Sequence, residues 1–181
     1  MTAFSSPSEY YTEVVPQQVM DALQGAPESK GQPDLIAIYE ITGAETDIFA
    51  LRFAGDQVEV LPEVPADADV RITLNDDDWR TSTAQGMLDP LTDYVQRRKV
   101  AVVKSLKGLV RVELTGSNGR IWQSATMFGG QAEPAVMLRM NADDYAAMMR
   151  GDLNGQMAFL TGKLQFEGSL PLLMQVGALS A

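Results

Sequence analysis

Residues 70–79 of this chain read VRITLNDDDW, and residues 136–145 read VMLRMNADDY. Both stretches place Val, Asn and two Asp at the same spacing and continue into an aromatic residue. In the first stretch, apolar residues alternate with Arg71 and Thr73, which is typical of a strand with one buried face. Asn followed by acidic residues is typical of a helix start. Each stretch therefore predicts a strand that runs directly into a helix.

The likeness between the two stretches extends upstream. Residues 41–43 (ITG) lie over residues 114–116 (LTG), and residues 48–49 (IF) lie over residues 121–122 (IW). Units of roughly 70 residues, each with strands, then helices, then a strand, indicate an internal duplication. We expect an N-terminal helical arm and linker over residues 1–32. A first, degenerate repeat follows over residues 33–107, and a second repeat over residues 108–181.

The helices and strands are expected at the following places. In the arm, Ser8 is a plausible cap of a first helix, and a second helix from Gln17 to Gln24 has Pro16 at its first turn and stops at Gly25. Alternation and turn residues predict the strands, which cover residues 35–41, 47–53, 57–61, 69–74 and 99–103 in the first repeat and residues 110–114, 120–126, 135–140 and 163–167 in the second.

Composition excludes several chemistries. The chain has no Cys and no His, so thiolate nucleophiles, disulfides, zinc clusters and Ser-His or Cys-His catalysis are absent. Lack of cysteine fits a reducing compartment. The first residues show neither a basic nor an apolar leader segment, and no later stretch reaches a membrane-spanning length. We expect a soluble, cytoplasmic protein without stable membrane insertion.

The net charge of -10 opposes binding to nucleic acid, so no nucleic-acid partner is expected. Basic residues gather locally, however, between positions 97 and 111. The favoured interpretation of this cluster is a solvated face whose basic side chains pair with surplus acids. The alternative is a contact with an acyl-CoA phosphate or an anionic membrane. Three acids at residues 76–78 favour a helix cap over a metal site.

The helices of the second repeat present apolar side chains. Asn141 is a good cap, with Asp144 approximating a capping box. A following short helix is expected from Gly155 to Thr161, and Leu164 and Phe166 share one side of the last strand. The helices and the sheet are thus expected to face each other across apolar residues.

Short motifs in this half resemble those of a known family. They are ADDY at 142–145, GDLN at 151–154, AFLTGKL at 158–164, EGSL at 167–170 and LLM at 172–174. In this order they are similar to the closing half of the sterol carrier protein (type 2) family, and residues 33–106 show a second, looser match. The resemblance implies an α+β fold in which a mixed or antiparallel sheet is covered by helices around an apolar tunnel for sterols, fatty acids or acyl-CoA esters. It implies no cofactor and no metal.

Each repeat departs from the family pattern in one place. The first has Arg97-Arg98-Lys99 where the family has Gly-Lys-Leu, and it lacks room for the terminal helix that lines the tunnel. The second lacks a counterpart of residues 57–63. We therefore expect two sterol-carrier-like repeats fused into one interlocked body.

The resulting hypothesis is a non-catalytic carrier of a hydrophobic ligand (a sterol, a fatty acyl or acyl-CoA group, or a similar apolar metabolite) that serves a lipid-metabolising or biosynthetic enzyme. One alternative is an isomerase or cyclase that uses Glu113, Asp144, Tyr145 or Glu167. Another is an accessory subunit with a degenerate pocket. No catalytic or metal-binding residue is assigned. The expected ligand contacts are the inward apolar residues of the second repeat, namely Tyr145, Met148, Met149, Met157, Phe159, Leu160, Phe166, Leu170, Leu173 and Met174.

Overall fold

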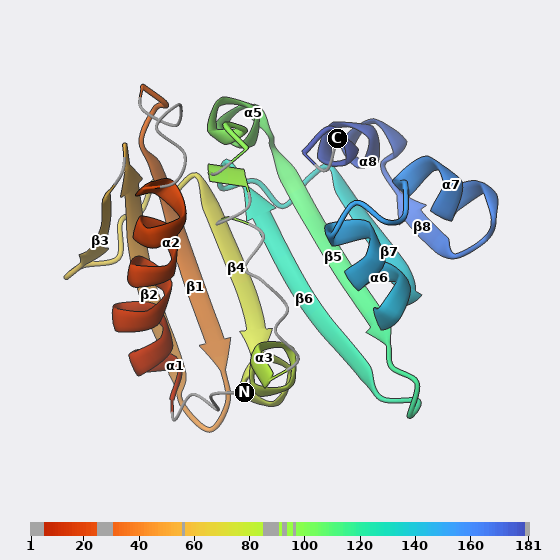
Figure 1. The fold of residues 1–181 in the computed structure, drawn as a ribbon, viewed down its shortest axis with the longest axis horizontal. Coiled ribbons are helices and arrows are strands. Elements are labelled where there is room, and N and C mark those ends of the chain that lie inside the picture. Colours follow the sequence, from red (N-terminus) through yellow and green to blue (C-terminus); the bar gives the residue numbers. More distant parts are fainter. Residues whose placement is uncertain are drawn as a thin grey trace.

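The computed structural model describes residues 6–24, 31–55, 57–84, 91, 94–95 and 97–179, and gives the backbone alone for residues 22, 24 and 149. The fold is α+β, with one open, mixed, eight-stranded sheet in the order β3-β2-β1-β4-β6-β5-β7-β8 (Figure 1). The strands are β1 (Leu35–Thr42), β2 (Thr46–Ala54), β3 (Gln57–Leu61), β4 (Val70–Asn75), β5 (Gly108–Thr115), β6 (Ile121–Phe128), β7 (Ala135–Asn141) and β8 (Leu164–Gly168).

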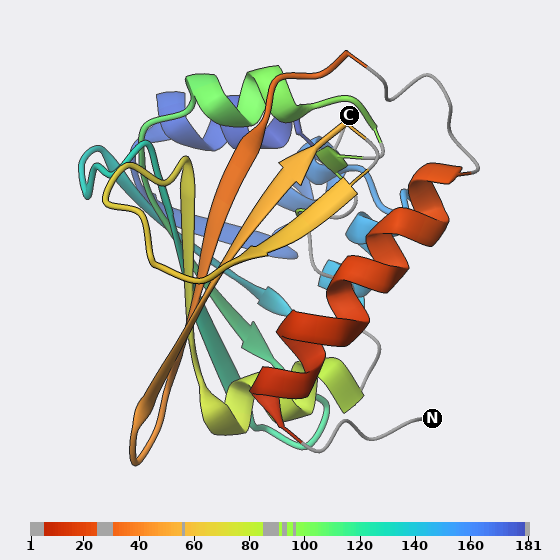
Figure 2. The same ribbon diagram turned by 90° about the vertical axis from the view of Figure 1, so that its left-hand side faces the viewer.

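Helices pack along one face of this sheet and at its ends (Figure 2). They are α1 (Pro7–Glu9), the π-helical turn η1 (Tyr10–Val14), α2 (Val15–Gln24), α3 (Asp76–Ala84), α5 (Val100–Ser105), α6 (Ala142–Met149), α7 (Gly155–Leu160) and α8 (Leu170–Gly177). None of the helices in the described part of the chain has the length and apolarity that a bilayer crossing requires.

Two groups of three strands have the same pairing. β1 pairs with β2 antiparallel and with β4 parallel, and β5 pairs with β6 antiparallel and with β7 parallel. The parallel pairs share a register, because Thr42 lies opposite Asn75 and Thr115 lies opposite Asn141. The two stretches that end in Asn therefore occupy equivalent places. We call residues 33–107 the first half and residues 108–181 the second half; their origin by duplication stays a prediction.

The hairpins of the two halves differ in length, which corrects part of the sequence alignment. Thr42 lies opposite Thr46, whereas Thr115 lies opposite Ile121. Leu114 is consequently opposite Trp122, in the place where the first half has Asp47. The alignment of residues 48–49 with residues 121–122 is wrong by this difference in loop length.

The halves join where β4 pairs with β6 antiparallel, and this pair has a counterpart at the end of the sheet. Ile72 lies opposite Thr126 in the β4–β6 pair, and Leu138 lies opposite Phe166 in the β7–β8 pair, in the same register. β6 is thus the antiparallel neighbour of β4, as β8 is the antiparallel neighbour of β7. Likewise, β4 lies against β6 where β3 lies against β2. Each half completes the sheet of the other.

This junction explains why the strand expected over residues 99–103 is wrong. The free edge of β4 is already covered by β6, so a further strand has no place there. Residues 100–105 instead form helix α5, in which Val100 and Val103 are buried and Val102 is exposed. Spacings of three residues suit one face of a helix. The first repeat was also expected to lack room for a helix ahead of β5, and α5 shows that a short helix fits there.

The N-terminal arm is one continuous helical segment rather than two helices. Ser6, not Ser8, caps it, because the Ser6 hydroxyl accepts a hydrogen bond from the Glu9 N–H. Pro16 lies inside the segment, as the second residue of α2 after the π-helical turn. Proline lacks the N–H that an α-helix requires, and a wider turn before it accommodates this loss. The expected stop at Gly25 lies outside the described residues.

Candidate functional site

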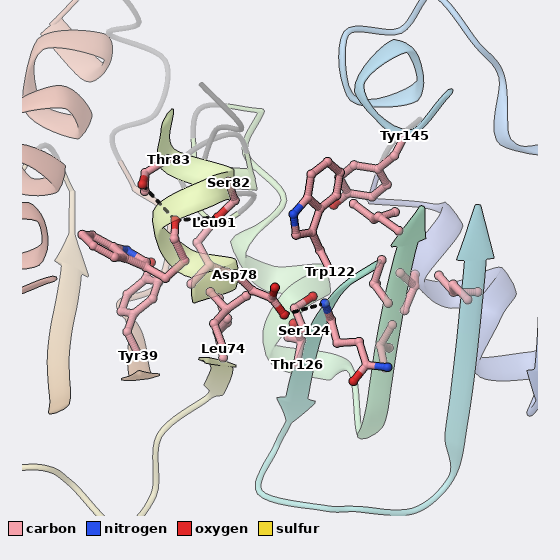
Figure 3. A pocket seen from close by; sticks show the side chains of 18 of the residues that line it. Tyr39, Leu74, Asp78, Ser82, Thr83, Leu91, Trp122, Ser124, Thr126 and Tyr145 are labelled. Atoms are coloured by element: carbon pink, nitrogen blue, oxygen red, sulfur yellow. Dashed lines mark hydrogen bonds between the residues drawn. The ribbon is translucent and has the colours of Figure 1, made fainter. Parts of the chain in front are cut away.

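A cavity of about 200 Å³ lies between the helix-bearing face of the sheet and the helices (Figure 3). Its floor comes from β1, β4, β6, β5 and β7, and its roof comes from η1, α3, α6 and α8 together with Leu91 and Tyr94. The lining is mainly apolar and aromatic. Both halves therefore build a single cavity, whereas the sequence motifs point to the second half alone.

β6 runs through the middle of the floor. Trp122, Ser124, Thr126 and Phe128 alternate along the strand and all line the cavity. Alternate residues of a strand point to the same face, so this set follows from the strand period. The same alternation in the sequence could have identified these residues, but their mixed polarity gave no contrast between the two faces.

The roof includes the aromatic residue that ends each of the two related stretches. Trp79 on α3 and Tyr145 on α6 hold equivalent positions after β4 and β7, and both line the cavity. Trp79 also packs edge-on against Tyr10, with 5.8 Å between ring centroids. In both halves, the aromatic residue that follows the strand therefore lines the cavity.

Asp78 is a buried carboxylate in the cavity wall, with 6% of its surface exposed. Its Oδ2 accepts hydrogen bonds from Asn75 Nδ2 at 2.7 Å and from the Gln123 backbone N–H at 2.9 Å. The Asp78 N–H in turn donates to Asn75 Oδ1 at 2.7 Å, so the helix cap expected at residues 75–78 is confirmed. Asp78 also ties α3 of the first half to β6 of the second.

The two tryptophans of the cavity carry unpaired donors. Among the described residues, Trp79 Nε1 and Trp122 Nε1 are the buried side-chain polar atoms that lack a hydrogen-bond partner. Trp79 is 1% exposed and Trp122 is 8% exposed. A buried donor without a partner costs about 1–3 kcal/mol. Both atoms belong to residues that line the cavity, which is where a partner would have to enter.

The structure brings only part of the expected ligand contacts to this cavity. Tyr145 and Met148 line it, and the side chain of Met149 lies outside the described residues. Phe166 and Leu173 pack against the core but do not line the cavity. The remaining residues are exposed instead of turned inward, by 49–76% of their surface: Met157, Phe159, Leu160, Leu170 and Met174.

The exposed residues have a simple structural reason. α7 buries Ala158, and α8 buries Leu172, so each short helix turns a small part of its surface to the core. Because α7 and α8 are apolar on several sides, their sequence does not show which side faces inward. The expectation that these side chains face inward is therefore wrong for the exposed ones, and their role as ligand contacts stays a prediction.

The carboxylates considered for catalysis lie in ion pairs away from the cavity. Glu113 and Glu167 both face Arg139, with N–O distances of 3.4 Å and 3.3 Å. Asp144 accepts a hydrogen bond from Lys163 Nζ at 2.6 Å. The Asn141 cap accepts from the N–H of Asp143, so the capping box expected with Asp144 is wrong.

Two residues of the basic cluster hold chain segments together. Lys104 Nζ lies 2.8 Å from Asp69 and donates to the Asp34 carbonyl at 2.8 Å. Lys99 Nζ donates to the Ala178 carbonyl near the C-terminal end of α8, at 3.3 Å. These contacts favour the structural interpretation of the cluster. The other members are Arg97, Arg98, Lys107 and Arg111.

The acids at residues 76–78 act at the start of α3. Asp76 pairs with Arg80 at 2.8 Å. Asp78 donates its N–H to the Asn75 cap and accepts a hydrogen bond from the Gln123 N–H of β6. Within the described ranges, no three His, Cys, Asp or Glu side chains are grouped so that they could hold a metal ion.

Comparisons with known proteins place the segment from Leu91 onward in a family. Residues 91–180 match the model of the SCP-2 sterol transfer family. Hydroxysteroid dehydrogenase-like protein 2 of Homo sapiens is 33% identical over 83 residues, which cover 41% of this chain and 20% of that protein. Peroxisomal multifunctional enzyme A of Dictyostelium discoideum is 30% identical over 87 residues, which cover 43% of this chain and 20% of that protein.

A solved structure with similarity is the sterol carrier protein domain 2 of Helicoverpa armigera, with a TM-score of 0.43 and 20% sequence identity, covering 59% of this chain and 89% of that one. The matched curated relatives extend far beyond the shared segment, since it spans only a fifth of each. The matched segment begins at Leu91 in the cavity wall and includes α5 and everything that follows it to residue 180. Through residues 91–180, the chain belongs to the SCP-2 sterol transfer family.

Proposed function

We propose that the protein is a non-catalytic binding or carrier protein whose hydrophobic ligand occupies the cavity between the sheet and the helices. The observation that carries this proposal is the cavity itself, with its mainly apolar and aromatic lining. Burial contributes about 0.8 kcal/mol per methylene, so an apolar ligand needs no strong ionic anchor. Membership of residues 91–180 in a sterol transfer family supports the same class of ligand.

The size of the cavity limits what it encloses. Sites for drug-sized molecules usually measure about 300–1,000 Å³. At about 200 Å³, this cavity fits a single ring system, a short chain, or one end of a longer lipid. We include in the proposal delivery to a separate lipid-metabolising or biosynthetic enzyme, because the matched relatives carry this segment as a fifth of a longer protein. A cytoplasmic location is also proposed, because a chain without cysteine fits a reducing compartment.

Two methionines test whether the ligand lies in this cavity. Met148 lines it, whereas Met174 on α8 is 70% exposed. A charged side chain in an apolar site is strongly unfavourable, so Met148→Asp should weaken binding of a fluorescent apolar probe by more than about tenfold. Met174→Asp should leave the affinity within about twofold.

The measurement is a fluorescence titration with the full-length protein, with far-ultraviolet circular dichroism to check that each variant is folded. A wild-type protein that binds no apolar probe would contradict the carrier function. Loss of binding in Met174→Asp, with Met148→Asp unaffected, would move the site to the exposed apolar residues of α7 and α8.

A further inference from the structure

The unpaired donors in the cavity indicate what its ligand must carry. An indole N–H can only donate, and a buried tryptophan usually places it on an acceptor. In the described part of the chain, Trp79 Nε1 and Trp122 Nε1 lack any acceptor although both residues are more than nine-tenths buried. Figure 3 shows the Trp122 nitrogen on the edge of the ring that is turned toward α3, the helix that carries Trp79.

We propose that the ligand carries a neutral carbonyl oxygen that accepts hydrogen bonds from the indoles of Trp79 and Trp122. This inference rests on the proposed carrier function and specifies the chemistry of its ligand. A carbonyl oxygen accepts through two lone pairs and donates nothing, which suits a donor-only indole N–H. A ketone, an aldehyde or an ester on an apolar skeleton meets this requirement.

The charges of the cavity favour a neutral acceptor over a carboxylate. Among the described lining residues there is one acid, Asp78, and no lysine or arginine. Arg120, which does not line the cavity, places its Nη2 3.6 Å from Asp78 Oδ1. A ligand carboxylate would therefore lie near the Asp78 carboxylate and would find no lysine or arginine among the described lining residues to pair with. Fatty acids in their ionised form fit this site less well than neutral ketones or esters.

The two indoles are held in place from different halves of the protein. The Trp79 ring is fixed by its edge-on contact with Tyr10 and by Arg80, whose guanidinium carbon lies 5.6 Å from the ring centroid. Trp122 belongs to β6 and lies opposite Leu114. The Asp78 to Gln123 hydrogen bond sets α3 against β6. Both donors are thus positioned before a ligand enters.

The sequence makes a direct test available, because the chain contains two tryptophans. An amide correlation spectrum of the full-length, nitrogen-15-labelled protein therefore shows two indole N–H signals, which Trp79→Phe and Trp122→Phe assign. We would titrate with acetophenone, ethylbenzene and benzoate, which share a benzene ring and differ in the acceptor. Acetophenone should move one or both indole signals downfield and bind about tenfold tighter than ethylbenzene, which is about 1.4 kcal/mol.

The variants separate the hydrogen bond from ring volume. Trp79→Phe and Trp122→Phe together should remove the preference for acetophenone over ethylbenzene. Because phenylalanine is smaller, a second version of the protein carries benzothienylalanine, which places sulfur where tryptophan has N–H, at both positions. This version should keep ethylbenzene binding and lose the preference for acetophenone.

Three other outcomes would contradict the carbonyl acceptor, its neutrality, or the carrier function, respectively. Equal affinity for acetophenone and ethylbenzene, with no downfield shift of either indole signal, overturns the carbonyl inference while the carrier function stands. Benzoate that binds as tightly as acetophenone overturns the neutral acceptor. If no ring compound or longer apolar probe binds, the carrier function itself fails.

Discussion

The two Asn-x-x-Asp-aromatic segments, residues 75–79 and 141–145, begin helices at the ends of equivalent strands, yet their acids have different surroundings. Asp78 is 6% exposed and accepts a hydrogen bond from the Gln123 N–H. Asp144, whose side chain is 25% exposed, pairs with Lys163. The same motif thus gives a buried hydrogen bond between α3 and β6 in the first half and a partly exposed ion pair in the second.

The sheet explains the difference. Leu74 lies opposite Ser124, and Met140 lies opposite Leu164. Gln123 and Lys163 each precede these partners, so the two acids reach equivalent places on the neighbouring strand. β6, however, is covered by β5 on its other side, whereas β8 is the last strand of the sheet. Position in the sheet, rather than the motif, decides whether the acid becomes part of the core.

The largest expected effect comes from separating the two halves. Expression of residues 1–107 and 108–181 as separate chains removes the β4–β6 pair and opens the cavity between the halves. Both fragments should be insoluble or should lack a cooperative thermal transition, as measured by calorimetry. Two fragments that each melt cooperatively would show that the halves are independent domains.

A smaller loss is expected from a charge on the buried side of α5, which stands where a strand was expected. Val103 is 0% exposed and Val102 is 36% exposed. Val103→Asp should lower the free energy of unfolding by more than about 3 kcal/mol, because an unpaired charge enters the core. Val102→Asp, the matched control, should change it by less than about 1 kcal/mol in urea denaturation. The reverse order would restore the strand interpretation of residues 99–103.

The comparison of the two acids can be measured directly. Asp78→Ala leaves the Gln123 N–H and the Asn75 amide without their acceptor, and should cost about 2–4 kcal/mol of stability. Asp144→Ala removes a partly exposed ion pair and should cost less than about 1 kcal/mol. Chemical denaturation of both variants gives the two values. Equal costs would mean that burial does not distinguish the two motifs.

The smallest effect concerns pH. Neither half contains His or Cys, so no unperturbed side chain titrates between about pH 6 and pH 8. Binding of a neutral apolar probe should stay constant across this range and should be indifferent to thiol reagents and chelators. A sharp change near pH 7 would instead point to a carboxylate with a strongly shifted pKa.

Most strands could be predicted because their signals are local. Val70, Ile72 and Leu74 alternate with polar residues, and a short turn separates β1 from β2, so periodicity and turn residues locate these strands within a few positions. The helix over residues 100–105 could not be predicted in this way. Its conformation depends on which strand covers β4, and that strand follows later in the chain.

The candidate site was predicted only in part for a similar reason. Apolar residues such as Leu160 and Met174 have the composition of a pocket wall but are exposed, whereas Asp78, Ser124 and Thr126 line the cavity in spite of their polarity. Tyr145 and Met148 were found because α6 has one consistent inward face. The share of the first half in the cavity depends on the β4–β6 junction, which no short motif encodes.

The order of synthesis gives this junction a further consequence. A ribosome makes β4 well before β6, and until residues 121–128 emerge, the nascent β4 has an open backbone edge beside buried residues such as Val70 and Ile72. An unpaired edge of this kind can capture the equivalent strand of another molecule. Slow release of residues 121–128 is therefore expected to favour pairing of β4 with a strand of another molecule over the β4–β6 pair within one chain.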